Sequence, residues 1–170
     1  MRQTNISLIL FFIFLICVSC SSEFDRNKFG QAEHIAQDIQ RSITAGAEYQ
    51  GFSQLVNQLS SELSGLKTKA KSEKEKELLR DYSDLLDMYK DGLLLLKYKM
   101  EFSRYSFVPK GLIYVGQDIE PIVEKYKLET KDHIFQPTLQ AWKSIPGDSI
   151  NAVWFNAGIQ FRRIINFLKE

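Results

Sequence analysis

Residues 72–100, SEKEKELLRDYSDLLDMYKDGLLLLKYKM, decide the fold. Ser72 and Glu75 have the spacing of a capping box, which predicts that a helix starts here. The run Leu93–Leu96 covers all faces of one turn, and such a turn is expected at the centre of the core. Apolar residues recur at intervals of three and four, the period of one helix face, at Leu78, Leu79, Tyr82, Leu85, Leu86, Tyr89, Leu93, Leu96 and Met100.

The end of this long helix is predicted by a proline. Pro109 has no amide hydrogen to donate, and it biases the residue before it away from helical geometry. We therefore expect the helix to end between Ser103 and Phe107.

Two further amphipathic helices are predicted before residue 72. The first runs from about Asn27 to near Gly46, and the second opens at Gly51. In the last turns of the second helix we expect three cations, because the negative end of the helix dipole favours them. They are Lys67, Lys69 and Lys71.

Residues 108–148 are the least regular part of the chain. Leu112 to Val115 fit a short extended piece, and Pro121 to Tyr126 fit a brief helix with proline in its first turn. Residues 131–143, interrupted by a proline, fit another helix. A turn at 146–149 then starts the clearest helix, whose apolar face is formed by Ile150, Val153, Trp154, Ala157, Phe161, Ile164, Ile165 and Leu168.

These elements predict an all-α fold. Four long helices joined by short links indicate a four-helix bundle-like domain with an irregular segment before the last helix. A looser orthogonal array of helices is the alternative. No stretch alternates with period two for long enough to favour a sheet. With 170 residues, 44% hydrophobic and 25% charged, we expect a single helical domain over residues 28–170.

The charge balance and the cysteines exclude several classes of function. The chain has 22 basic and 21 acidic side chains, and loss of residues 1–19 removes only Arg2, leaving 21 of each. No nucleic-acid partner is expected, since such proteins carry a marked basic excess. Cys17 and Cys20 are the only cysteines, so residues 28–170 contribute none to a disulfide, a zinc site or a thiol nucleophile.

The N-terminal segment has the form of an export signal. Arg2 precedes eleven unbroken apolar residues, Leu8–Val18, which is too short a run to span a membrane. Cys17-Val18-Ser19-Cys20 then resembles the lipobox of bacterial lipoproteins at three positions of four, with Cys17 standing where leucine is usual. An uncleaved signal anchor and a plain secretory signal are the alternatives.

The resemblance to bacterial lipoproteins implies an address outside the cytoplasm. It implies that residues 1–19 are a removed signal peptide, that Cys20 is lipidated, and that residues 20–27 are the lipidated cysteine and a short tether. Membrane lipid is then a partner through the acylated Cys20. If the source has two membranes, Ser21 in place of aspartate favours the outer one.

No catalytic, metal or cofactor motif stands out. His34 lies off its apolar row and is expected to be an exposed polar residue. Lys131, Asp132 and His133 could do acid–base chemistry if they met in a cleft, but adjacency alone does not predict this. The spacings of haem, di-iron, nucleotide and serine-hydrolase sites do not occur, so no cofactor, metal site or catalytic residue is assigned.

The glutamates at the start of the long helix are expected to be solvated. Glu73, Glu75 and Glu77 alternate with two lysines over one and a half turns. Such a pattern is typical of an exposed, salt-bridged first turn rather than of a carboxylate site.

The aromatic residues, 12% of the chain, indicate a candidate interaction surface. Phe155 stands to one side of the last helix's apolar face, and Arg162 and Arg163 follow it. Trp142 precedes a Pro-Gly turn. Exposed aromatics and arginines are typical anchors of protein interfaces. The alternative interpretation is that these residues pack the irregular segment onto the helices.

The leading hypothesis is a non-enzymatic, lipid-anchored helical domain that binds an envelope protein or helps to maintain the envelope. One rival is a binder of an apolar or peptidic ligand, which requires a cavity between the long helix and residues 108–148. A second is an enzyme that uses Asp132 and His133 or scattered carboxylates. A third is an immunity or inhibitor lipoprotein that neutralises a toxin or a lytic enzyme.

Overall fold

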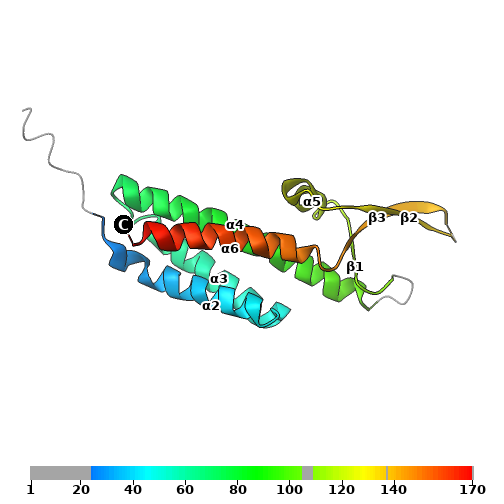
Figure 1. Ribbon diagram of the computed structural model, residues 1–170, viewed down its shortest axis with the longest axis horizontal. Helices are drawn as coiled ribbons and strands as arrows, with labels where there is room; N and C mark the ends of the chain where they lie inside the picture. Colours follow the sequence, from blue (N-terminus) through cyan, green and yellow to red (C-terminus); the bar gives the residue numbers. More distant parts are fainter. Residues whose placement is uncertain (1–23, 105–108, 137, 170) are drawn as a thin grey trace, which may run out of the picture.

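The computed structural model describes residues 24–104, 109–136 and 138–169. The chain is mostly helical, and a small three-stranded sheet stands at one end of the helices (Figure 1). The predicted all-α class is therefore wrong in its strict form. The predicted signal peptide, residues 1–19, and Cys20 lie outside the described residues.

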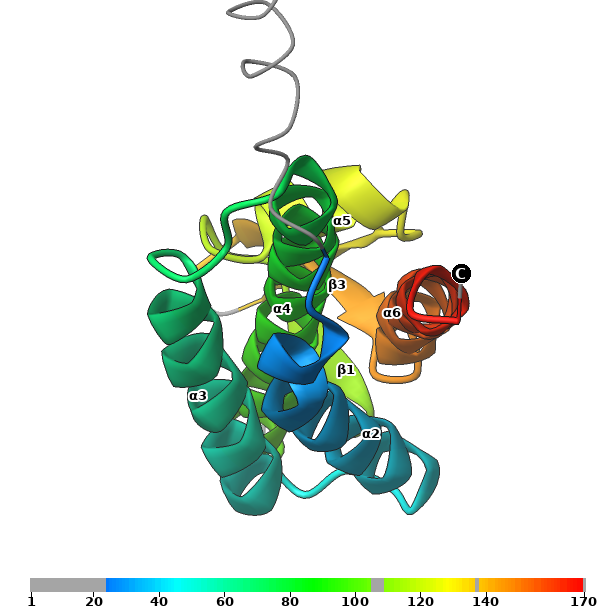
Figure 2. The ribbon, with the colours of Figure 1, turned by 90° about the vertical axis from the view of Figure 1, so that its left-hand side faces the viewer.

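Four long helices lie side by side. The bounds are α2 Gly30–Thr44, α3 Tyr49–Leu66, α4 Glu73–Phe102 and α6 Ile150–Phe167, and the 3-10 helix η1 Arg26–Phe29 leads into α2. The long α4 packs against both α3 and α6, while α2 packs mainly against α3 (Figure 2). The helices predicted from the three-to-four spacing are thus confirmed.

The ends of the helices differ in part from those predicted. The capping box at the start of α4 is confirmed, because the Ser72 hydroxyl accepts a hydrogen bond from the Glu75 amide at 3.2 Å. The helix ends at Phe102, one residue before the predicted interval. The prediction for Lys67, Lys69 and Lys71 is wrong. These lysines follow the last turn of α3, because two amides in this stretch turn back to the carbonyl of buried Leu66.

The described part of the predicted tether belongs to the folded domain. The ring of Phe24 lies 6.5 Å from that of Phe29 and 6.0 Å from that of Phe167. The Asp25 carboxylate caps η1 by accepting a hydrogen bond from the Asn27 amide at 3.1 Å. Phe24 and Asp25, which were predicted to lie in the tether, therefore make contacts with the helices.

The core consists of two hydrophobic clusters. The larger one fills the space between α2, α3, α4 and α6. The smaller one lies between α4 and the sheet and contains Leu95, Ile113, Ile119, Ile122, Ile145, Ile150 and Val153. The run Leu93–Leu96 lies where the clusters meet, with only Leu95 fully buried. This turn was predicted to be the centre of the core, and it is instead the junction between its two parts.

The indole of Trp154 on α6 packs directly against the backbone of α4 at Gly92. A Cβ atom on Gly92 would lie 2.0 Å from Cη2 and 2.1 Å from Cζ3 of Trp154. The indole also lies 5.0 Å, centroid to centroid, from the ring of Phe52 on α3. Gly92 is therefore required because its missing side chain leaves the space that the indole occupies.

The segment between the long helices holds the sheet and one short helix. The bounds are β1 Leu112–Tyr114, α5 Glu120–Tyr126, β2 Lys131–Phe135 and β3 Gln140–Pro146, and the strands pair antiparallel in the order β1-β3-β2. The extended piece near 112–115 and the brief helix near 121–126 are confirmed. The helix predicted within 131–143 is wrong, because the residues on either side of Pro137 pair as a hairpin in which His133 opposes Trp142.

Candidate functional site

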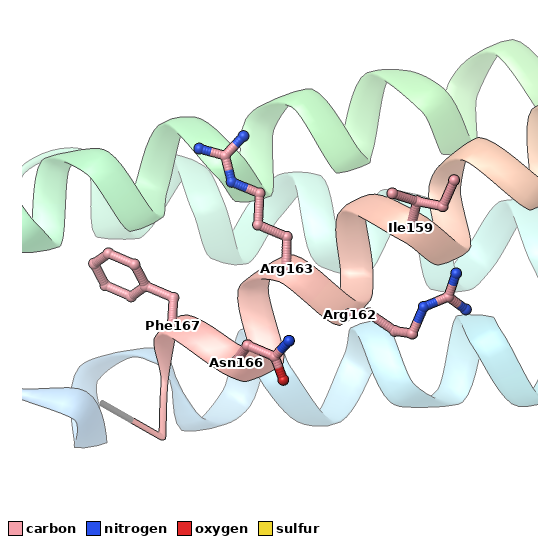
Figure 3. A pocket seen from close by; sticks show the side chains of 5 residues that line it. All are labelled: Ile159, Arg162, Arg163, Asn166 and Phe167. Carbon is pink, nitrogen blue, oxygen red and sulfur yellow. The ribbon is translucent and has the colours of Figure 1, made fainter.

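The first candidate site is the outer face of α6, defined by Phe155, Ile159, Arg162 and Asn166. These residues follow one another at intervals of four, three and four, so they share one face of the helix. The side chain of Phe155 is 66% exposed and that of Ile159 is 46% exposed. A shallow pocket of about 440 Å³ lies here, lined by Ile159, Arg162, Arg163, Asn166 and Phe167 (Figure 3).

The two arginines on α6 have different surroundings. Arg163 points towards α4, where its Nε lies 3.7 Å from Oδ2 of the buried Asp81, while Arg162 points to the other side of the helix (Figure 3). The amide of Gln160 also donates to Asp81, at 3.2 Å from Oδ1. Arg162 forms no ion pair with any residue that the structure describes. Arg163 therefore helps to hold α6 on α4, whereas Arg162 is exposed.

Trp142 does not lie with the other predicted interface residues. It is half-buried in β3, and its rings stack between His133, at 4.2 Å, and Tyr114, at 6.2 Å. The stack continues through Phe102 and Tyr98 on α4. Adjacent ring planes differ by only 13° to 29°, so the rings lie nearly parallel along the row. This row joins the sheet to α4, and Trp142 has the packing role that was the alternative interpretation.

The histidines do not form an acid–base cluster with their neighbours in sequence. His133 Nε2 lies 2.7 Å from Oγ of Ser144, whose side chain is fully buried and out of reach of a substrate. Asp132 opposes Lys143 and points to the other face of the strand. His34 is exposed as predicted and lies 3.2 Å from a carboxylate oxygen of Asp38. Among the described residues, no three histidines, cysteines or acids are grouped so that they could hold a metal ion.

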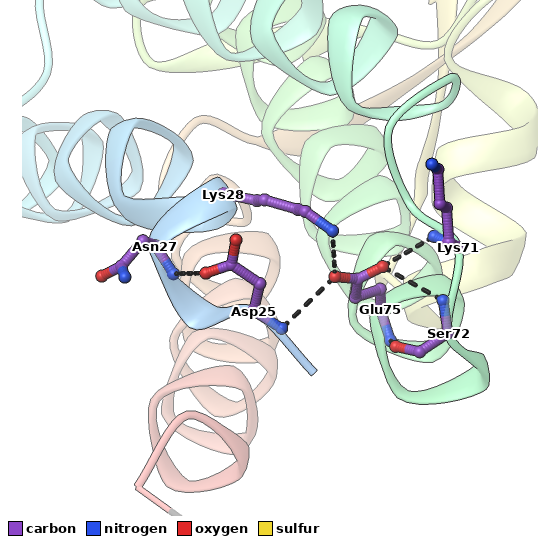
Figure 4. A network of polar contacts seen from close by, with 6 residues as sticks. All are labelled: Asp25, Asn27, Lys28, Lys71, Ser72 and Glu75. Atoms are coloured by element: carbon purple, nitrogen blue, oxygen red, sulfur yellow. Dashed lines mark hydrogen bonds and ion pairs between the residues drawn. The ribbon is translucent and has the colours of Figure 1, made fainter. Parts of the chain in front are cut away.

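Glu75 is a buried carboxylate, contrary to the predicted solvated turn. The prediction is right for Glu73, which is 83% exposed and pairs with Lys76. The Glu75 side chain has no exposed surface. Its oxygens accept hydrogen bonds from Lys28 Nζ at 2.6 Å and from the amides of Lys71 at 2.6 Å, Ser72 at 3.1 Å and Asp25 at 3.3 Å (Figure 4).

The electrostatics of Glu75 follow from these donors. Burial by itself raises the pKa of the carboxyl, but the hydrogen bonds from Lys28 and from the three amides outweigh it and lower the pKa to about 2. Glu75 is therefore charged at neutral pH. Its carboxylate joins Asp25 and Lys28, near the start of the described chain, to Lys71 and Ser72 in the turn between α3 and α4. These contacts hold the fold together.

The second candidate site is the tip of the β2–β3 hairpin, which the sequence did not predict. Three large apolar side chains are exposed here, Ile134 by 59%, Phe135 by 37% and Leu139 by 75%. The amide of Thr138 donates to the carbonyl of Phe135 at 3.1 Å and closes the turn. Leu139 has a φ of +54°, in the left-handed region that a leucine rarely adopts.

The hairpin tip and the C-terminal end of α6 lie at opposite ends of the molecule. Figure 1 shows β2 and β3 projecting beyond the helices, while the C-terminal end of α6 lies at the other end. The space between α4 and the sheet, which an apolar ligand would need, is filled by the smaller hydrophobic cluster. The structure therefore gives the ligand hypothesis no support at that place.

None of the described helices is both long enough and apolar enough to cross a membrane. No family model, no curated protein and no solved structure matches this chain.

Proposed function

We propose that the protein is a lipid-anchored, non-enzymatic module of the cell envelope that binds another envelope protein through its β2–β3 hairpin. Acylated Cys20 holds the chain in a membrane facing away from the cytoplasm, which is the outer membrane if the source has two. The four long helices act as a bundle-like support for the hairpin. A toxin or a lytic enzyme is one kind of partner that such a module could neutralise.

Leu139 carries this proposal. It is 75% exposed and has a φ of +54°. For a residue with a side chain, the left-handed conformation costs roughly 1–2 kcal/mol. Strain of this kind persists where surrounding structure or function requires it. Here the strained residue places an apolar side chain in solvent at the tip of the β2–β3 hairpin, where Ile134 is also exposed. This arrangement suits contact with an apolar groove on a partner.

Replacing Leu139 with glycine is expected to separate stability from function. Glycine adopts positive φ without strain, so the free energy of unfolding should rise by about 1 kcal/mol after the entropic cost of glycine. The partner that is crosslinked in intact cells, and recovered through a C-terminal tag, should be lost. Denaturant unfolding and mass spectrometry measure the two effects.

Lys127→Gly is the matched control for this prediction. Lys127 also has a positive φ, +52°, and it is exposed at the end of α5, away from the hairpin tip. It should gain stability in the same way and keep the partner. If Leu139→Gly still captures the same partner as the wild type, the hairpin is not the binding element.

The lipid anchor is tested by fatty-acid labelling. Cys20→Ala should abolish incorporation of labelled palmitate, because the thiol that receives the diacylglyceryl group is gone. Cys17→Ala should leave labelling intact and serves as the control. Labelling that survives in Cys20→Ala would overturn the anchor.

A further inference from the structure

We infer that the outer face of α6 lies on the membrane that holds the anchor, where Arg162 binds phosphate groups of anionic phospholipids. Phe155 and Ile159 enter the headgroup region of the same membrane. This inference rests on the lipid anchor proposed at Cys20, and it goes beyond it by assigning an orientation to the whole domain.

The position of the anchor brings this face to the lipid. Only three residues, Ser21 to Glu23, separate Cys20 from Phe24, so the two Cα atoms can be at most about 14 Å apart. The ring of Phe24 lies 6.0 Å from the ring of Phe167, edge to face. Phe167 itself lines the pocket on α6. The C-terminal end of α6 is therefore held within a short distance of the acylated cysteine.

The chemistry of the face matches an anionic bilayer surface. The sequence of α6 contains two arginines and no acidic residue. Arg162 has no ion pair within the described residues, so its charge is available to a ligand. Basic residues gain about 1 kcal/mol each near an anionic membrane. The exposed Phe155 and Ile159 lie on the same face, and such side chains bury themselves at the headgroup boundary.

This orientation also places the hairpin. Because α6 runs alongside α4, a membrane beneath α6 makes the long axis of the domain lie along the membrane surface (Figure 1). The β2–β3 hairpin then projects sideways, close to the bilayer. A partner reached by the hairpin is thus a protein embedded in, or attached to, the same membrane.

The test uses the full lipidated chain in vesicles. Residues 24–169 contain no cysteine, so Ile159→Cys introduces a single thiol for an environment-sensitive fluorophore. The matched control is Gln58→Cys, an exposed position on α3. Vesicles are made from phosphatidylcholine alone or mixed with phosphatidylglycerol, and a lipid-borne quencher is included.

The emission of the fluorophore at position 159 is expected to shift to the blue and to be quenched by the lipid-borne quencher. Both effects should grow with the fraction of phosphatidylglycerol, and neither should occur at position 58. Arg162→Glu should reduce the signal at 159 to the level of the control, whereas Arg80→Glu, an exposed charge reversal on α4, should not. Equal exposure to water at 159 and 58 would overturn the inference, as would crosslinking from position 159 to a protein rather than to lipid. A chain that fails to enter vesicles at all contradicts the anchor instead, so the two failures are distinguishable.

Discussion

Replacing Gly92 with alanine is expected to destabilise the protein by about 3 kcal/mol, the upper end for overpacking of a core. The new Cβ would lie 2.0 Å and 2.1 Å from two atoms of the Trp154 indole. The indole cannot simply move away, because it packs against both hydrophobic clusters and against Phe52. In a helix interior, alanine is more favourable than glycine by about 1 kcal/mol. A loss of stability in Gly92→Ala can therefore come only from the clash with the indole.

Gly158→Ala in α6 is the matched control for this substitution. A Cβ there meets nothing closer than Arg162 Nη1 at 3.8 Å, which is an ordinary contact. This variant should gain up to about 1 kcal/mol from its helix propensity. Denaturant unfolding of both variants measures the difference, and Trp154→Phe should recover part of the stability in the Gly92→Ala background. Equal stability of the two alanine variants would show that α4 and α6 are further apart at this point.

Glu75→Gln is expected to lower the free energy of unfolding by about 3 kcal/mol at neutral pH. The substitution removes the charge that pairs with Lys28 Nζ at 2.6 Å, and it places an amide group among donors that already point at the site. Removing one partner from a buried, hydrogen-bonded ion pair has effects of this size. Glu73→Gln is the matched control in the same turn, and it should be indistinguishable from the wild type because Glu73 is exposed.

The contribution of Glu75 should also depend on pH. The pKa of its carboxyl is lowered from 4.5 to about 2 in the folded protein. The stabilisation is therefore fully present above pH 4.5 and is lost as the pH falls towards 2. In urea unfolding experiments, the free energy of unfolding should fall less between pH 7 and pH 3 for Glu75→Gln than for the wild type. An equal loss in both proteins would place the acid sensitivity elsewhere.

The sequence predicts the four long helices well, because their signals are local. The capping box of Ser72 and Glu75 and the spacing of apolar residues each depend on neighbours within one or two turns. The hairpin is different. Strands of five and seven residues show too few alternations to stand out. In the same stretch Phe135, Leu139 and Trp142 follow one another at intervals of four and three, which fit a helix as well.

The candidate sites were predicted only in part. Phe155, Arg162 and Arg163 were recognised because aromatics and arginines beside an apolar face stand out in a sequence, and all three are exposed on α6. The burial of Glu75 could not be predicted, since its partner Lys28 is 47 residues away in the chain. The exposure of Leu139 depends on the geometry of a turn that the sequence pattern did not reveal.

The packing of α6 on α4, which includes the contact between Asp81 and Gln160, can form only late in synthesis. These residues are 79 positions apart, and α6 is synthesised after every other described helix and strand. Until α6 has been made, the side of α4 that packs against α6 is uncovered, and the space at Gly92 that Trp154 occupies is empty. The export proposed above requires an unfolded polypeptide, and a fold that is completed only by its last helix suits this requirement. Under that proposal, the late completion of the fold by α6 keeps the newly made protein competent for export.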